Sequence, residues 1–145
     1  MSAEENKALP RRMIEEVFNA GNLEVIDEIV SQDHVHHDPA MPEEGHGREH
    51  AKEFASMYRS AFPDLHVEIQ DQIAEGDRVA IRWVASSTHK GDLMGINPTG
   101  NRVTLVGMTI ERIADGQIAE TWEIYDALGM MQQVSAIPSP EEAQA

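Results

Sequence analysis

The spacing of apolar residues changes at Pro63, and this change constrains the fold more than any other feature of the chain. Before it, Ala51, Phe54, Ala55 and Tyr58 recur at helical spacing, which predicts a long helix over about 48–62 that ends at the proline. After it, apolar and polar residues alternate, which is typical of half-buried strands. Helices followed by antiparallel strands predict an α+β domain.

Two further helices and a short strand are expected before the long helix. An apolar stripe runs from about Glu4 to Ala20, and a proline at position 10 is best tolerated in a first turn, so the start of this helix is uncertain. Gly21 ends the stripe, and Asn22 can cap a second helix that continues to Val30. The segment 31–41 predicts a short strand that a proline at position 39 stops, and 41–47 predicts a loop.

The first predicted hairpin follows the long helix. Its strands begin near Leu65 and Arg78, and the turn lies at 75–77. Pairing position 74 with 78 would set Ile69 opposite Trp83 and position 71 opposite 81. The loop over 90–101 is long for a simple connection, so we expect it to form the rim of a cavity.

Asp115-Gly116 predicts a second, tighter hairpin between strands over about 102–113 and from 117 onward. Taken literally, that turn sets position 109 opposite 122, Gly107 opposite 124 and position 105 opposite 126. A glycine beside the last strand would leave space for a ligand. The other face carries apolar residues as well, at positions 106, 108, 110 and 125, and two copies of the chain could cover it in a homodimer.

Length and charge limit the possible functions. The 145 residues predict one domain over 1–134, with a disordered tail over 135–145. A formal charge of -15 argues against nucleic acid and anionic membranes and favours a neutral or cationic small partner. The chain has no cysteine, which excludes disulfides, zinc-thiolate sites and a thiol nucleophile. An N-terminus without an apolar signal core predicts a cytoplasmic protein.

Asp126 is the carboxylate that the sequence singles out. Five apolar residues surround it in the chain, at positions 122, 124, 128, 130 and 131. Poor hydration would raise its pKa, and such a group can exchange protons with a substrate near neutral pH. The simpler interpretation is that Asp126 caps a helix that begins at Ala127, and the two roles are compatible.

A family resemblance rests on six segments that follow one another from about Asn6 to Gln133. They read EEVFNAGNLEVIDEIV, HVHHDP, SAFPDL, AEGDRVAIRW, THKGDLMGINPTG and ERIADGQIAETWEIYDALGMMQQ. In their order and spacing the chain resembles the SnoaL-like polyketide cyclases, or ester cyclases, whose fold is related to nuclear transport factors. The resemblance implies a curved, mostly antiparallel sheet wrapped around a long helix to form a cone with an internal cavity.

The resemblance also implies a reaction and a set of site residues. The reaction is an intramolecular aldol condensation that closes a ring in a polyketide ester, without metal or cofactor. Asp126 matches the family's acid/base in W-x-x-x-D, and His37 and His89 match positions that line the pocket and are expected to be catalytic with it. The expected substrate-binding residues are Phe54, Tyr58, Arg82, Trp83, Gly107 and Trp122. The chain departs from the family in reading S-T-H before Lys90, where G-T-H is common.

Three other interpretations stay open. A metal site could form from the histidines and aspartates over 33–50, because His34 and His36 would share one strand face. Asp71 and Arg82 could join Asp126 in opening an epoxide. The chain could also be a binding or assembly module without catalysis. The main prediction remains a homodimer, paired through its sheet, that binds a small hydrophobic molecule such as a polyketide.

Overall fold

The computed structural model describes residues 2–135, so the predicted tail lies, apart from Ser135, outside the described residues. The helical segments are α1 (Ala3–Arg12), the π-helical η1 (Met13–Asn19), α2 (Val25–Ile29), α3 (Gly47–Ala61) and α4 (Ala127–Gln133). The strands are β1 (Val30–His37), β2 (Gly45–His46), β3 (His66–Glu75), β4 (Arg78–Thr88), β5 (Arg102–Ala114) and β6 (Gln117–Tyr125).

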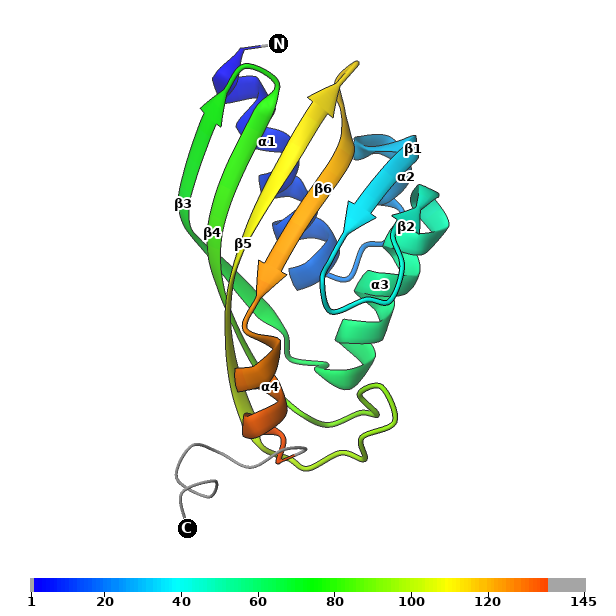
Figure 1. Ribbon diagram of the computed structural model, residues 1–145, viewed down its shortest axis with the longest axis vertical. Coiled ribbons are helices and arrows are strands. Elements are labelled where there is room, and N and C mark those ends of the chain that lie inside the picture. Colours follow the sequence, from blue (N-terminus) through cyan, green and yellow to red (C-terminus); the bar gives the residue numbers. More distant parts are fainter. Residues whose placement is uncertain (1, 136–145) are drawn as a thin grey trace.

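The strands form one curved sheet that does not close on itself (Figure 1). Their order is β2-β1-β6-β5-β4-β3; β1 and β6 are parallel, and the other neighbours are antiparallel. The helices α1, η1, α2 and α3 lie on one side of the sheet, with α3 against β1. The predicted α+β class and the curved sheet are therefore confirmed.

The first helix starts earlier than its proline suggested. Ser2 and Glu5 form a capping box at the start of α1, and Pro10 consequently lies well inside the helix. The chain then continues as the π-helical η1 up to Asn19. Gly21 ends this segment with φ +77°, the left-handed conformation expected of a glycine after a helix. The second helix is shorter than predicted, because it begins at Val25 after a turn and is not capped by Asn22.

The long helix is where the sequence placed it. α3 covers Gly47–Ala61, and it buries Ala51, Ala55, Tyr58 and Ala61 against the rest of the molecule. The spacing of these four residues puts them on one face of the helix, so burial of that face holds α3 in place.

One inserted residue in each hairpin changes the predicted register. In β3, Ile69 pairs with Trp83 as expected, but Gln70 is extra, so Asp71 pairs with Arg82 instead of Ile81. The turn itself pairs Glu75, not Ala74, with Arg78. Each bulge turns the residues beyond it to the opposite face of the sheet.

The second bulge matters more for function. Ala114 pairs with Gln117 and Ile113 with Ile118, as the Asp-Gly turn predicts. Ala119 is then extra, and Glu120 and every later β6 residue pair one position away from the prediction. Thr109 therefore lies opposite Glu123, not Trp122.

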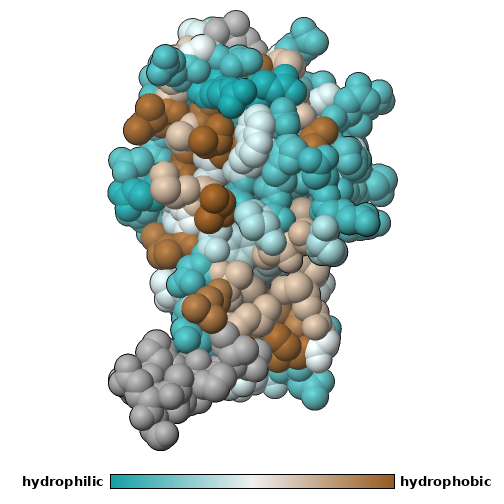
Figure 2. Space-filling view, in the orientation of Figure 1, coloured by the Kyte–Doolittle hydropathy of each residue, from teal (hydrophilic) through white to brown (hydrophobic). Residues whose placement is uncertain are grey.

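The outer face of the sheet is rich in exposed apolar side chains. Val106, Met108 and Ile110 of β5 and Ile124 of β6 are between 42% and 68% exposed. Figure 2 shows hydrophobic side chains spread along this face between hydrophilic ones. The prediction that positions 106, 108 and 110 share an outer face is correct, but Tyr125 faces inward.

The loop over 90–101 packs at the end of the molecule near α4. Leu93 is fully buried in a cluster with Phe62, Met130 and Val134. No residue of this loop lines the main pocket, so the expectation of a cavity rim is wrong. Within residues 2–135, no helix is long and apolar enough to cross a membrane.

Candidate functional site

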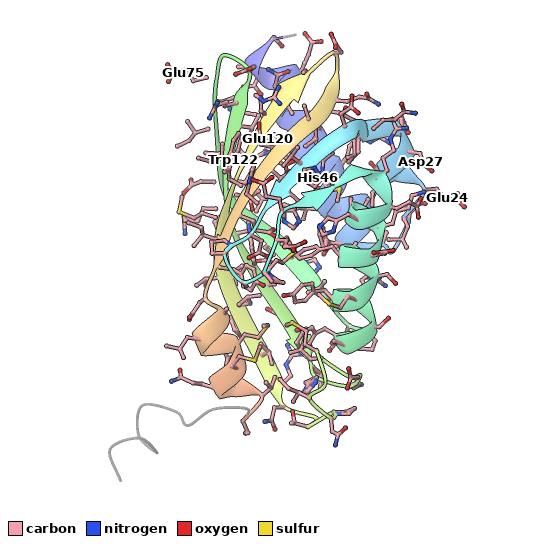
Figure 3. All side chains as sticks on the ribbon, turned by 45° about the vertical axis from the view of Figure 1, so that its right-hand side comes forward. Glu24, Asp27, His46, Glu75, Glu120 and Trp122 are labelled. Carbon is pink, nitrogen blue, oxygen red and sulfur yellow. The ribbon has the colours of Figure 1, made fainter. Side chains whose placement is uncertain are left out.

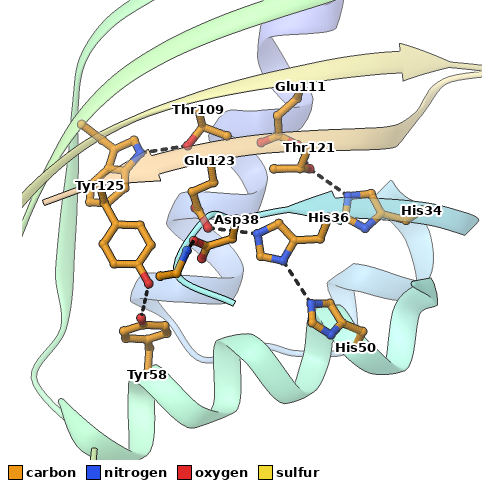
Figure 4. Close-up of polar contacts among 12 residues, drawn as sticks. His34, His36, Asp38, His50, Tyr58, Thr109, Glu111, Thr121, Glu123 and Tyr125 are labelled. Carbon is orange, nitrogen blue, oxygen red and sulfur yellow. Dashed lines mark hydrogen bonds and ion pairs between the residues drawn. The ribbon is translucent and has the colours of Figure 1, made fainter. Parts of the chain in front are cut away.

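The main pocket lies between the helices and the concave face of the sheet. Most of its lining is apolar, from Met13, Ile14, Phe18, Val30, Ala51, Phe54, Leu65, Val67, Ile81, Trp83, Ala85, Leu105 and Ile118. The polar lining side chains are His34, His36, Tyr58, Thr109, Glu111, Thr121, Glu123 and Tyr125. All of these except Tyr58 come from β1, β5 and β6, so the pocket has one polar wall (Figure 4).

The β6 bulge builds this wall. The extra residue at Ala119 brings Thr121, Glu123 and Tyr125 to the concave face, where they line the pocket. Without it, Trp122 and Ile124 would point into the pocket, and its polar wall would be lost.

A hydrogen-bonded chain connects β1, β6 and β5. His34 Nε2 lies 2.8 Å from Thr121 Oγ1, and the Thr121 hydroxyl donates to Glu111 Oε2 over 3.4 Å. Burial, with a further contribution from the charge of Glu123, raises the pKa of Glu111 to about 8. Burial likewise lowers the pKa of His34 to about 4, so its imidazole is neutral at neutral pH. His34 Nδ1 is buried, and within residues 2–135 it has no hydrogen-bond partner.

A second polar group lies beside this chain. His36 Nε2 is 3.0 Å from Glu123 Oε2, and His36 Nδ1 is 3.0 Å from His50 Nε2 on α3. Burial lowers the pKa of His50. Because a carboxylate can only accept, His36 donates from Nε2 to Glu123, and the tautomers of the two rings decide which of His36 Nδ1 and His50 Nε2 is the donor in their bond. Potential metal ligands on His36, Asp38 and Glu123 all lie within 4.8 Å of one another.

Aromatic side chains border the polar wall. Trp83 donates from Nε1 to Thr109 Oγ1 over 2.9 Å, and the Tyr58 and Tyr125 hydroxyls are 2.8 Å apart. Burial raises the pKa of Tyr58 to about 12, and it also raises the pKa of Tyr125. Both tyrosines are therefore neutral hydrogen-bonding groups at neutral pH.

Phe54, Tyr58 and Trp83 line the pocket, among the residues that the sequence predicted to bind substrate. Gly107 faces the same side, but its space is filled: a Cβ there would overlap the indole of Trp83. The glycine therefore makes room for the tryptophan, not for a ligand.

Other predicted site residues lie on the outer face. Trp122 lies on β6 close to Glu120 (Figure 3), pairs across the sheet with Ile110 and stacks on His37, with ring centroids 5.4 Å apart. His37 also contacts Glu120 over 2.6 Å. Arg82 forms an exposed ion pair with Asp71 at 2.7 Å, so these two residues cannot reach the pocket to open an epoxide. The bulge in β6 turns Trp122 to the outer face, and the regular alternation of β4 places Arg82 on the outer face as well.

Asp126 and His89 also lie apart from the pocket lining. Asp126 is exposed and caps α4, accepting from Gly129 N over 2.8 Å. Its predicted poor hydration is therefore wrong, because Ile124 and Leu128 are themselves exposed and do not cover it. His89 is fully buried beside Phe62, where its Nδ1 contacts the hydroxyl of Thr99 over 3.0 Å.

Glu111, Thr121, Glu123 and Tyr125 are site residues that the sequence prediction missed or placed on the outer face. Glu111 carried a usable signal, because it alternates in phase with Leu105 and Thr109 on the inner face of β5. No such signal existed for Thr121 and Glu123, because simple alternation counted from the Asp-Gly turn places both side chains on the outer face of the sheet. His34 and His36 share one strand face as predicted, but each engages a different partner.

Comparison with known proteins gives one family and consistent structures. A family model described as SnoaL-like polyketide cyclase matches residues 8–134. A provisionally named polyketide cyclase from Acidithiobacillus ferrooxidans is 32% identical, with a TM-score of 0.82, over 94% of this chain and 99% of that one.

Two Streptomyces structures are similar as well. AclR from Streptomyces galilaeus, provisionally named a hydroxylase, is 31% identical with a TM-score of 0.84, over 95% of this chain and 85% of its own. IdmH from Streptomyces antibioticus, provisionally named a polyketide cyclase, is 31% identical with a TM-score of 0.78, over 90% of this chain and 98% of its own. No curated protein matches the chain.

Proposed function

Because this chain belongs to the SnoaL-like polyketide cyclase family, which supports a cyclase-type function, we propose that it closes a ring in a polyketide ester or a similar small hydrophobic carbonyl compound. The reaction proposed is an intramolecular aldol condensation in the pocket between the helices and the sheet. The observation that carries the proposal is the position of Glu111, a buried carboxyl on the wall of an apolar pocket, with a pKa raised to about 8.

A group with this pKa suits proton exchange near neutral pH. A general acid or base works best when its pKa lies near the working pH, and burial is the usual way to raise the pKa of a carboxyl that far. A methylene between two carbonyl groups is acidic enough for such a base. The apolar lining would hold the substrate folded, with the reacting carbons close together.

Proton transfer would run through the chain His34–Thr121–Glu111. With Glu111 ionised, Thr121 donates to it, His34 donates from Nε2 to Thr121, and the lone pair of His34 Nδ1 is free. Nδ1 is buried in the free protein, so substrate must move into contact with it; Nδ1 then takes the proton from the methylene while the Nε2 proton passes to Thr121 and the hydroxyl proton passes to Glu111. The imidazole therefore never carries a full charge, and Glu111 ends protonated.

Ring closure then returns the proton. The enolate carbon attacks a carbonyl carbon, so a C–C bond forms and the carbonyl π bond breaks to give an alkoxide. The alkoxide takes the proton from His34 Nδ1, and the same chain runs backward to leave Glu111 ionised. The neutral hydroxyls of Tyr58 and Tyr125 bond to each other over 2.8 Å, so one hydroxyl hydrogen of the pair remains to donate to a carbonyl oxygen in the same pocket.

Asp126, with His37 and His89, is the catalytic set that the family resemblance implies, and it is the competing hypothesis for the acid/base group. Its exposure and its capping bond to Gly129 favour the structural role. The two hypotheses make opposite predictions for two isosteric variants, Glu111→Gln and Asp126→Asn, since each removes one titrating group and keeps its shape.

The deciding experiment is turnover of a panel of linear polyketide methyl esters, followed by the chromophore of the closed ring and by product mass. Binding is followed separately through Trp83 fluorescence in a Trp122→Phe background, which leaves a single tryptophan in the pocket. We expect the wild type and Asp126→Asn to turn over one ester, and Glu111→Gln to bind that ester without turnover.

Other outcomes would reassign the site or the function. Loss of turnover in Asp126→Asn, with Glu111→Gln active, would move the chemistry to Asp126. Esters that quench Trp83 fluorescence but are never converted by the wild type would make the chain a binding module and refute the cyclase proposal.

We propose in addition that two copies pair through the outer face of the sheet. Four apolar residues are exposed there on the neighbouring strands β5 and β6, and protein interfaces often cover exposed apolar side chains that lie close together. The pocket opens on the opposite side of the sheet, so this pairing would leave it accessible.

A further inference from the structure

His36, Asp38 and Glu123 form a compact group of potential ligands at the junction of β1 and β6 (Figure 4). They carry one imidazole and two carboxylates, and their ligand atoms all lie within 4.8 Å of one another. His36 is 5% exposed, Asp38 is 7% exposed, and the side chain of Glu123 is 14% exposed. This burial separates the group from ordinary acidic surface clusters.

Asp38 is the residue that points to a missing partner. Its Oδ1 accepts from the backbone N–H of Ala40 over 2.8 Å, which fixes the orientation of the carboxylate. Its Oδ2 is buried and has no hydrogen-bond partner within residues 2–135. A buried carboxylate oxygen without a partner is costly, and it is normally paired with a cation or a hydrogen-bond donor.

The two carboxylates also need positive charge nearby. No lysine or arginine in the described part of the chain forms an ion pair with Asp38 or Glu123; Arg112 of the neighbouring strand β5 pairs with Glu120. Like charges held close together in a buried site repel each other, so a bound cation would stabilise the arrangement.

The geometry suits a transition-metal ion. His36 Nε2 and Glu123 Oε2 are 3.0 Å apart, so a small movement would let both contact one ion, whose bonds to nitrogen and oxygen are about 2.0–2.2 Å long. His50 Nε2 contacts the other nitrogen of His36 over 3.0 Å and holds the ring in place. With an ion on Nε2, His36 would donate from Nδ1 to His50, the usual support for a metal-bound histidine.

We propose that His36, Asp38 and Glu123 bind one divalent first-row transition-metal ion, such as Zn²⁺ or Mn²⁺. Mixed nitrogen and oxygen ligands favour such ions over Mg²⁺. His36 and Glu123 line the pocket, so an ion held by them would lie next to a bound ligand. An ion there would supply Lewis-acid polarisation of a ligand carbonyl.

This inference departs from the prediction of a metal-free site and from the metal cluster considered from the sequence. Of the histidines over 33–50, only His36 is a ligand in the proposed site. His34 is turned to Thr121, and His37 lies on the outer face with Glu120. The metal site shares no residue with the Glu111 chain, so its test does not depend on ring closure.

Calorimetric titration of the metal-free protein with Zn²⁺ tests the site, and titration with Co²⁺ followed by visible absorption reports on the ligands. We expect one ion per chain with micromolar affinity. Asp38→Asn and Glu123→Gln should each weaken binding at least tenfold, because each removes a charged ligand and keeps the size of the side chain. His50→Gln should weaken it by a smaller factor.

Two controls separate this site from the surface. Asp33→Asn removes an exposed carboxylate of the same strand, and His46→Ala removes an exposed imidazole beside Glu44; neither should change the affinity for Zn²⁺. Thermal unfolding shows whether each variant is folded, and either ligand variant is sufficient for the test.

Zn²⁺ affinity that is unchanged in both Asp38→Asn and Glu123→Gln would overturn the proposal. So would one equivalent of Zn²⁺ that disappears in His46→Ala, which would move the site to the surface loop. Failure of the wild type to bind Zn²⁺, Mn²⁺ or Co²⁺ at millimolar concentration would overturn the proposal as well.

Discussion

Gly107 and Trp83 lie opposite each other across β4 and β5, and the indole occupies the space that a side chain at position 107 would need. We therefore expect Gly107→Ala to push the indole out of place and to destabilise the protein by about 1–3 kcal/mol, as overpacking of a core usually does. Denaturant unfolding measures the loss, and Trp83 fluorescence reports the displacement.

The same substitution in a Trp83→Phe variant tests whether the indole is the cause of the destabilisation. In Trp83→Phe the smaller ring leaves room for the added methyl group, so Gly107→Ala should cost less there than in the wild type. Equal costs in the two backgrounds would show that the glycine is needed for its backbone and not for the indole.

Glu111 predicts a pH dependence of stability. Its pKa is raised from 4.5 to about 8 in the folded protein, mainly by burial, so the folded state keeps a proton that the unfolded state loses between these values. The contribution of Glu111 to stability is therefore full below about pH 4.5 and is lost as the pH rises through 8.

Glu111→Gln isolates this effect, because the amide keeps the shape and cannot ionise. The free energy of unfolding of the variant relative to the wild type should rise by on the order of 2–4 kcal/mol between pH 5 and pH 8.5. Chemical denaturation at both pH values measures it. A difference between the two proteins that stays constant with pH would mean that Glu111 ionises at an ordinary pH.

Thr121 controls the ionisation of Glu111 in the proposed reaction. Its hydroxyl donates to the carboxylate and lowers the pKa, although burial outweighs this contribution. Thr121→Val should therefore raise the pKa of Glu111 further, which moves the pH-dependent loss of stability to higher pH, and it should abolish turnover because it breaks the chain between His34 and Glu111. Thr121→Ser keeps the hydroxyl and should keep both the wild-type turnover and the wild-type pH dependence of unfolding. If Thr121 were only structural, Thr121→Val would lower stability equally at every pH.

The sequence predicted the architecture well because hydrophobic spacing and turn chemistry are local signals. The spacing up to Phe62 predicted α3, and Asp115-Gly116 predicted the tight turn between β5 and β6. The polar wall was not predictable in this way, because it depends on the bulge at Ala119, and alanine has no preference for a bulge. Because of this one inserted residue, Glu123 and not Trp122 faces the pocket.

Asp126 shows a second limit of prediction from local sequence, which concerns burial. Its neighbours in the chain are apolar, but strand alternation and the start of α4 carry Ile124 and Leu128 to the surface beside it. Apolar neighbours in sequence therefore did not become apolar neighbours in space, and the cap was the interpretation that the local sequence could support.

The outer face of the sheet predicts the oligomeric state. Met108 and Ile124 pair across β5 and β6, and both are more than half exposed. If two copies pair there, Met108→Glu should place like charges in the interface and give a monomer by light scattering. Met94→Glu is a matched control, since Met94 is also about half exposed but lies in the loop over 90–101. Monomeric wild type would refute the pairing.

Two substitutions of Asp126 distinguish its role in capping α4 from a role in catalysis. Asp126→Ala removes the acceptor for Gly129 N and should cost about 1 kcal/mol of stability, whereas Asp126→Asn keeps an acceptor oxygen and should cost less. If the chemistry belongs to the pocket wall, both variants should keep wild-type kcat at a temperature where both are folded. A fall in kcat of a hundredfold or more in Asp126→Asn, with unfolding nearly unchanged, could not come from the cap and would return the catalytic role to Asp126.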